Sequence, residues 1–368
     1  MRYFFNFYIF YFFLLPFIFL FDLENLNLEY FFILSIFLFF LFGLNLRLNE
    51  RTRVETFNYS VLNIQHFFLF LFFSLYFVDF QTHFETLISI YNGEYFEAGI
   101  EKSIIRYTYE TKPTVLSQFS TIFYFCFCFT LGVILSNVNK YKFLFIILWL
   151  ILAIFETSTL SRASLVLGIT GIATTFIYNF RYEFPKISIL KIHLYLSLIL
   201  LTLFGVFSIS AFGRVSNSEN AFNIVLEKLS SYTIAMYEAL LLWLQEFNFS
   251  SFKFGVNTFT FIPKLVGIKF ESGFYLPIDT KFGETNIYTF VRGIIEDFSF
   301  FSLFIFLIFG FQINLLDSKL NSSKFFLVFN LWIINLFLYP MISIFNFTTY
   351  FIGYFIFAVF VNKKNIQL

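Results

Sequence analysis

The sequence predicts an all-α, polytopic integral membrane protein with about ten transmembrane helices and one large outer loop. Of its 368 residues, 59% are hydrophobic and only 13% are charged, whereas a soluble domain carries about 25% charged residues. The mean hydropathy is +0.78, and long apolar runs recur along the whole chain. These observations predict a single polytopic membrane domain over residues 1–368.

Ten segments are predicted as transmembrane helices, each of which needs roughly 20 mostly apolar residues. They are residues 3–21, 30–46, 61–80, 115–136, 143–157, 163–180, 192–212, 298–315, 325–340 and 347–361. The first segment lacks a small-residue cleavage site, so a retained helix is expected rather than a signal peptide.

The lysines and arginines of the short loops predict the orientation, because cytoplasmic loops are enriched in them. With the N-terminus inside, every predicted inside segment is basic. The residues concerned are Arg2; Arg47, Arg51 and Arg53; Lys140 and Lys142; Arg181, Lys186 and Lys191; Lys319 and Lys324; and Lys363 and Lys364. The outer loops 22–29 and 341–346 contain no lysine or arginine. Both termini are therefore expected in the cytoplasm.

The largest predicted non-membrane segment is the outer loop 213–297. Within it, residues 232–247 are apolar enough to be considered as a further span. A crossing there would invert every later segment and place the basic C-terminal loops outside, against the charge rule. An interfacial or re-entrant helix is predicted instead, with Glu238 on its polar side.

A polar stretch, GETNIYTFVRGIIEDF (283–298), ends this loop at the mouth of the predicted eighth span. Arg292 and Glu296 are four residues apart, so a helix would place them on one face. The candidate site residues here are Asn286, Tyr288, Thr289, Arg292, Glu296 and Asp297. The alternative is an interfacial belt, with Tyr288 as an anchor and Arg292 snorkelling or paired with Glu296.

A second polar stretch, ETSTLSRASLVLGITG (156–171), joins the predicted fifth and sixth spans. Because the connection is short, Glu156 and Arg162 are expected near membrane depth, where a charge costs about 2.5–3.5 kcal/mol and marks a functional candidate. The alternative is a Glu156–Arg162 pair that locks two helices. Arg106 and Arg214 supply two more outer guanidinium groups, which are suited to phosphate. Taken singly, each is an ordinary loop charge.

Several classes of chemistry lack a sequence signal. Cys126 and Cys128 point in different directions on a helix, no further cysteine accompanies them, and no HExxH motif is found. The predicted cytoplasmic loops are short and contain no glycine-rich phosphate-binding loop. The sequence therefore predicts no metal, no cofactor and no nucleic-acid partner, and it places any chemistry at the outer surface, independent of cytoplasmic ATP.

Three stretches resemble the O-antigen polymerases, which join oligosaccharide repeat units. TNIYTFVRGIIEDF followed by FSLFIFLIFG is similar to their C-terminal signature, TSTLSRASLVLGI to their Ser/Arg turn before a span, and FKFGVNTFTFIPKL to a Gly-x-x-Thr-Phe element of their large loop. The resemblance covers the second half of the chain, and the first half by topology alone. One departure is Ser299 and Ser302, where the family usually has glycine.

The resemblance implies a glycosyltransferase of the bacterial inner membrane, acting on its periplasmic side upon undecaprenyl-diphosphate-linked repeat units in lipopolysaccharide or related polysaccharide biosynthesis. It also implies a chain-length regulator as a partner. As a hypothesis, Arg162 and Arg292, with Arg214, hold the donor diphosphate. Asp297 or Glu296 would take the proton of the acceptor hydroxyl, with His83 as a weaker candidate.

Asn286 and Tyr288 would contact sugar, and Thr289, Arg106 and Glu156 complete the expected substrate-binding set. Three alternatives stay open. An O-antigen ligase has a similar topology but a lipid A core acceptor. A lipid-linked oligosaccharide flippase usually has internal repeats and short loops, neither of which this chain shows. A membrane scaffold would not need charges at membrane depth.

Overall fold

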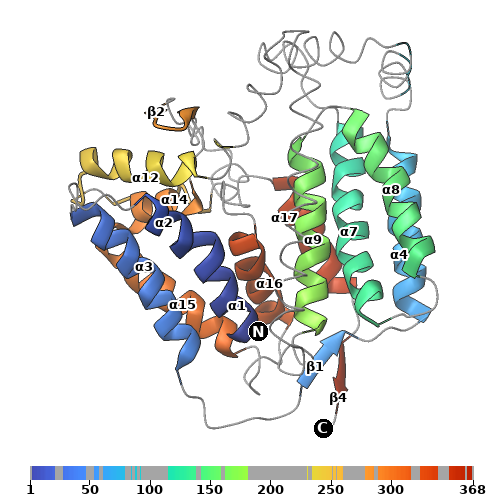
Figure 1. The fold of residues 1–368 in the computed structure, drawn as a ribbon. Helices are drawn as coiled ribbons and strands as arrows, with labels where there is room; N and C mark the ends of the chain where they lie inside the picture. The colour runs from blue at the N-terminus through green and yellow to red at the C-terminus, as the bar shows by residue number, and fades with distance from the viewer. Residues whose placement is uncertain are drawn as a thin grey trace.

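A computed structural model describes most of the predicted helical segments of the chain. The described residues are 2–20, 28–46, 54–57, 61–78, 84, 88, 92, 115–137, 142–158, 162–180, 230, 234–250, 252–253, 255–259, 278–285, 289–315, 324–338, 348–360 and 363–366. They are mostly helical, as Figure 1 shows. The predicted class, a helical membrane protein, agrees with this.

Helices occupy nine of the ten predicted spans. They are α1 (Arg2–Ile9), continued by a π-helical turn η1 (Phe10–Leu14) and α2 (Leu15–Phe19), then α3 (Leu28–Asn45), α4 (Val61–Tyr76), α7 (Val115–Asn137), α8 (Lys142–Ser158), α9 (Arg162–Phe180), α15 (Ser302–Leu315), α16 (Lys324–Leu338) and α17 (Thr348–Phe360). Among the described residues, three helical stretches are long and apolar enough to cross a membrane, Leu28–Asn45, Val115–Ser136 and Phe290–Leu315. The predicted span 192–212 lies outside the described residues, and the total of ten stays a prediction.

Two short antiparallel strand pairs accompany the helices. β1 (Val54–Phe57) pairs with β4 (Lys363–Ile366), so the segment after α3 meets the C-terminal strand. Figure 1 shows this pair at the lower end of the molecule, where both chain termini are marked. That both termini face the cytoplasm stays a prediction. The second pair, β2 (Ile278–Thr280) with β3 (Gly283–Thr285), lies at the opposite end.

The left-hand group of helices in Figure 1 is built on a close, parallel contact between α3 and α15. Phe32 contacts Phe300, in the 3-10 turn (Ser299–Phe301) that precedes α15, and Phe37 contacts Phe306 further along both segments. Glycine allows the close approach. A Cβ atom on Gly310 would lie 2.0 Å from the carbonyl oxygen of Phe40. Small residues at such contacts let helix backbones meet where lipid supplies no hydrophobic driving force.

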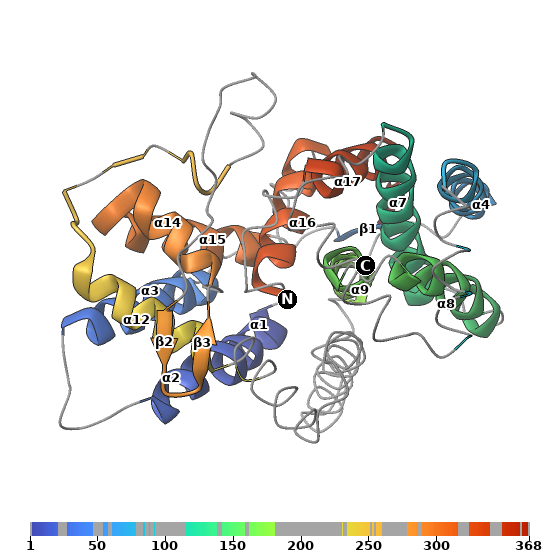
Figure 2. The ribbon, with the colours of Figure 1, turned by 90° about the horizontal axis from the view of Figure 1, so that it is seen from above.

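The right-hand group consists of α4, α7, α8 and α9. α7 and α9 run parallel, since Thr175 donates a hydrogen bond to the carbonyl of Phe129 at 2.9 Å and Asn179 donates to Ser136 at 2.9 Å. α16 and α17 lie between the two groups in Figure 2. α17 also packs along α7, where the Cys126 thiol lies 3.1 Å from the carbonyl oxygen of Gly353.

The upper end of the left-hand group carries two further helices, α12 (Ala235–Glu246) and α14 (Phe290–Phe298). α12 lies across the top of α3, and its Tyr237 contacts the ring of Phe17. A helix is thus found over most of residues 232–247, and its interfacial or re-entrant position stays a prediction. Glu238 accepts a hydrogen bond from the backbone N–H of Lys281, which ties α12 to the β2–β3 turn.

One predicted boundary needs correction. Residues 290–297 were assigned to the outer loop, but they form helix α14, which continues through a short 3-10 turn (Ser299–Phe301) into α15. The two helices are separated at Ser299, whose φ is +49°. A positive φ is strained for any residue except glycine.

Candidate functional site

α14 is an amphipathic helix with its apolar side turned into the protein. Phe290 packs against Phe13, Phe306 and Phe337 of three other helices, and Val291 and Ile295 are fully buried. The polar residues of the helix are therefore left on the other side. Thr289 precedes the first turn in an extended conformation. Its hydroxyl is buried and makes no hydrogen bond in the part of the chain that the structure describes.

Arg292 and Glu296 share one face of α14, as their spacing predicts. The Arg292 Nε donates to Glu296 Oε1 at 2.9 Å. The guanidinium carbon also lies 4.6 Å from the ring centre of Trp243, on α12. The Arg292 side chain is only 12% exposed. This arginine is thus held between an aromatic face and a carboxylate, and these two contacts fix the position and orientation of its guanidinium group.

Glu296 gathers three donors around one carboxylate. Besides Arg292, it accepts a hydrogen bond from Asn257 Nδ2 at 2.8 Å through Oε2. The ammonium group of Lys253 lies 3.6 Å from the same oxygen. The Glu296 side chain is 8% exposed, whereas that of Lys253 is 52% exposed. Lys253 is therefore the solvent-facing cation of this cluster.

Asp297 is fully buried, and both of its carboxylate oxygens accept backbone N–H groups. Its Oδ1 accepts the backbone N–H of Asn257 at 3.0 Å, and its Oδ2 accepts that of Thr258 at 2.5 Å. A buried carboxylate is costly unless hydrogen bonds compensate it. The two N–H groups provide that compensation from a segment about 40 residues earlier in the chain.

Two glycines allow the segment that carries Lys253, Asn257 and Thr258 to turn and to approach α14 closely. Gly255 has φ +87°, a conformation that favours glycine. Gly293 on α14 faces Asn257, and a Cβ atom there would lie 3.7 Å from the Asn257 carbonyl oxygen. After α14, the Ser299 hydroxyl donates to the carbonyl of Phe249. The described residues 249–250, 252–253 and 255–258 thus follow α14 on its polar side.

The electrostatics of α14 oppose a simple helix rule. Glu296 and Asp297 lie at the C-terminal end, where the helix dipole disfavours negative charge. Arg292, Lys253 and the two backbone N–H groups offset this cost. The acidic pair consequently depends on the segment 249–258 for its stability, and that segment depends on the pair for its place.

The other predicted site residues are not joined to this cluster by the described structure. Arg106, Arg214, Asn286 and Tyr288 lie outside the described residues. Glu156 is in the last turn of α8 and Arg162 begins α9, with only the backbone described. Figures 1 and 2 both place α8 and α9 in a different group of helices from α14. That Arg162 and Arg292 contact one diphosphate stays a prediction.

The structure also reveals a buried polar cluster that the sequence analysis did not single out. Asn335 on α16 accepts hydrogen bonds from Thr174 on α9, at 2.9 Å, and from Tyr350 on α17, at 2.6 Å. Asn335 is fully buried. The sequence did contain a signal for this cluster, since Asn335 is a polar residue within the apolar stretch WIINLFLYP. Polar residues inside predicted spans commonly form hydrogen bonds between helices.

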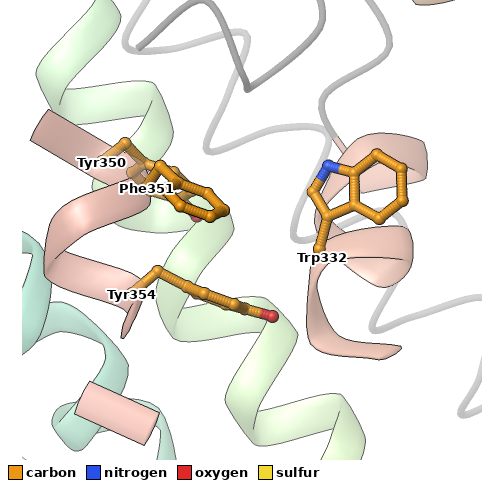
Figure 3. A pocket seen from close by; sticks show the side chains of 4 residues that line it. All are labelled: Trp332, Tyr350, Phe351 and Tyr354. Carbon is orange, nitrogen blue, oxygen red and sulfur yellow. The ribbon is translucent and has the colours of Figure 1, made fainter. Parts of the chain in front are cut away.

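A small aromatic pocket adjoins this cluster. Figure 3 shows Tyr350, Phe351 and Tyr354 projecting from α17 toward Trp332 on α16. Tyr350 belongs to both features, since its ring lines the pocket while its hydroxyl binds Asn335. The pocket is apolar apart from the tyrosine hydroxyls and the indole nitrogen.

Within the described ranges, no three His, Cys, Asp or Glu side chains are grouped as metal ligands. The charged groups brought together are Arg292, Lys253, Glu296 and Asp297, beside Trp243. Their arrangement can attract an anion through Lys253 and offers an aromatic ring nearby. A scan against family models finds no match, and no curated protein or solved structure matches the chain.

Proposed function

We propose that the chain is a glycosyltransferase that polymerises undecaprenyl-diphosphate-linked oligosaccharide repeat units on the periplasmic side of the bacterial inner membrane. The observation that carries this proposal is the cluster of Arg292, Glu296 and Lys253 beside Trp243, at one end of a helical membrane protein. The cluster falls on the stretches 252–265 and 283–298, which resemble O-antigen polymerases.

The chemistry fits a site without a cofactor. The acceptor hydroxyl oxygen bonds to the anomeric carbon of the donor sugar, and the bond from that carbon to the diphosphate oxygen breaks. The lipid diphosphate leaves with the electron pair, and the hydroxyl proton goes to a base, for which Asp297 and Glu296 are the sequence candidates. Because the leaving group is already activated, the protein's main task is to stabilise the developing negative charge.

Cations near the membrane surface suit this task. Guanidinium and ammonium groups bind phosphate oxygens. The attraction between such a cation and a phosphate becomes stronger when water is excluded from the site. An aromatic ring such as Trp243 presents an apolar face on which a sugar can stack. The lipid bilayer would supply the donor by lateral diffusion, and a chain-length regulator would be the expected protein partner.

The deciding experiment is a gel of surface lipopolysaccharide from a strain lacking the gene, beside the complemented strain. Polymerase activity predicts a ladder that collapses to core plus one repeat unit, since flipping and ligation continue. Loss of the single-unit band, with accumulation of lipid-linked units, would contradict the proposal. It would favour an O-antigen ligase or a lipid-linked oligosaccharide flippase.

A further inference from the structure

The two neighbouring carboxylates of α14 both bind the same distant residue. Asn257 donates its backbone N–H to Asp297 at 3.0 Å and its side-chain amide to Glu296 at 2.8 Å. Two consecutive residues of one helix usually point in different directions. Asn257 satisfies both because its backbone and side-chain donors diverge. This bridging makes it the central contact between α14 and the segment 249–258.

The contacts of Asp297 leave little capacity for proton transfer. Both of its oxygens accept backbone N–H groups, and the side chain has no exposed surface. A general base must come within about 2.6–3.2 Å of the hydroxyl that it deprotonates. A sugar hydroxyl could reach Asp297 only after the backbone at Asn257 and Thr258 moved away. Asp297 therefore suits a positioning role.

The same contacts determine where Lys253 stands. Lys253 precedes the turn at Gly255 and lies 3.6 Å from Glu296, half exposed to solvent. Arg292 occupies the other oxygen of Glu296 but is almost buried beneath Trp243. Of the two cations on this carboxylate, Lys253 is the one that an outside ligand can contact directly.

We infer that Asp297 and Asn257 are positioning residues, which hold the segment 249–258 against α14 so that Lys253 contacts the diphosphate of a lipid-linked substrate. The inference rests on the proposed function for the identity of the ligand. Lys253 acts as a mobile point charge, exchanging its 3.6 Å contact with Glu296 for a phosphate oxygen. Arg292 stays in place and supplies a fixed charge behind it.

Acetylation of lysine amines, quantified by mass spectrometry, tests the contact without requiring turnover. The full-length protein in lipid nanodiscs is treated with an amine-reactive ester, with undecaprenyl diphosphate or undecaprenol as the probe. At about ten times the dissociation constant, bound diphosphate should slow acetylation of Lys253 roughly tenfold. Lys281 is the matched control, because it is exposed in the β2–β3 turn and should react at an unchanged rate.

Undecaprenol should protect neither lysine, since it lacks the diphosphate. Equal protection by undecaprenol, or no protection of Lys253 by the diphosphate, would overturn the assignment of Lys253. Selective protection without polymer formation by the wild-type protein would retain this binding site and reject polymerisation. The two failures are therefore distinguishable.

Variants test the positioning role. Asp297→Ala and Asn257→Ala should each abolish the selective protection of Lys253 while the protein remains folded by thermal melting. Asp297→Ala removes the acceptor of two backbone N–H groups, and Asn257→Ala removes the amide donor to Glu296, so the two substitutions weaken the same attachment to α14 through different hydrogen bonds. Combining them should add little once either single loss has released Lys253. In the polymerisation assay, Asp297→Asn should keep the pH profile of the residual activity. A profile that loses its acidic limb in Asp297→Asn would identify a general base and overturn the positioning role.

Discussion

The Arg292 guanidinium lies between Glu296, which accepts its Nε–H at 2.9 Å, and the indole ring of Trp243, 4.6 Å away. Three separate parts of the chain are joined by this arrangement, since Glu296 also binds Asn257. A flexible surface arginine would sample many rotamers, whereas this one is fixed on both sides. The arrangement links the stability of the end that carries α12 and α14 to the charge that the proposed reaction needs.

Replacement of Arg292 by alanine is expected to reduce polymer growth strongly while the protein still reaches the membrane. The change removes a charge-assisted hydrogen bond, about 1.5–3 kcal/mol, or roughly a 10- to 150-fold loss in kcat/KM if the bond acts in the transition state. Lipopolysaccharide gels and a membrane immunoblot measure the two effects. The exposed Lys281→Ala variant is the control and should keep normal chains. Normal chain lengths in Arg292→Ala would remove Arg292 from the mechanism.

Trp243 should be more important for its ring than for its indole N–H. Trp243→Ala removes the cation–π contact, worth about 0.5–2 kcal/mol, and should reduce polymerisation about two- to thirtyfold. Trp243→Phe keeps an aromatic face toward Arg292 and should recover most of the activity. Initial rates with a lipid-linked repeat unit would measure both variants. Equal loss in the two would point to a hydrogen bond or to packing instead of the ring face.

The sequence predicted the helices better than the contacts of the site. Uninterrupted apolar runs such as 30–46 and 115–136 correspond to α3 and α7, because length and hydropathy alone define them. The predicted end of the outer loop at residue 297 was wrong, because the apolar residues of α14 alternate with charged residues in the sequence and do not form an uninterrupted apolar run. The spacing of Arg292 and Glu296 predicted that they share one face of a helix, and their pairing is the one that the alternative of an interfacial belt included.

Long-range partners explain what the sequence could not reveal. Asp297 resembles any other acidic residue near a membrane surface until the backbone N–H groups of Asn257 and Thr258 are seen to bind it. Lys253 likewise gains significance only from its distance to Glu296. No local pattern encodes a contact between residues about 40 positions apart.

The contact between α3 and α15 should tolerate no side chain at Gly310. An added Cβ would lie 2.0 Å from the Phe40 carbonyl oxygen, so the backbones must separate. Such overpacking costs about 1–3 kcal/mol, although alanine by itself favours a helix over glycine by about 1 kcal/mol. Gly310→Ala should lower the Tm of the protein in detergent.

Gly293→Ala is the matched control for this helix substitution. Its added Cβ would meet the Asn257 carbonyl oxygen at 3.7 Å, an ordinary van der Waals distance. The Tm should therefore stay the same or rise slightly. A Gly310→Ala protein as stable as Gly293→Ala would show that α3 and α15 can separate without cost.

The parallel course of α3 and α15 makes a prediction about membrane topology. Two parallel spans require an odd number of crossings between them, and α4, α7, α8 and α9 occupy four of the predicted spans in that interval. The sequence predicts the fifth crossing at 192–212. Alkaline phosphatase, which is active only outside the cytoplasm, should be inactive when fused after residue 183 and active after residue 250. Fusion at the C-terminus should be inactive, as the cytoplasmic reference. Equal activity at 183 and 250 would contradict a single crossing at 192–212, and it would require a segment after residue 250 to supply the missing one.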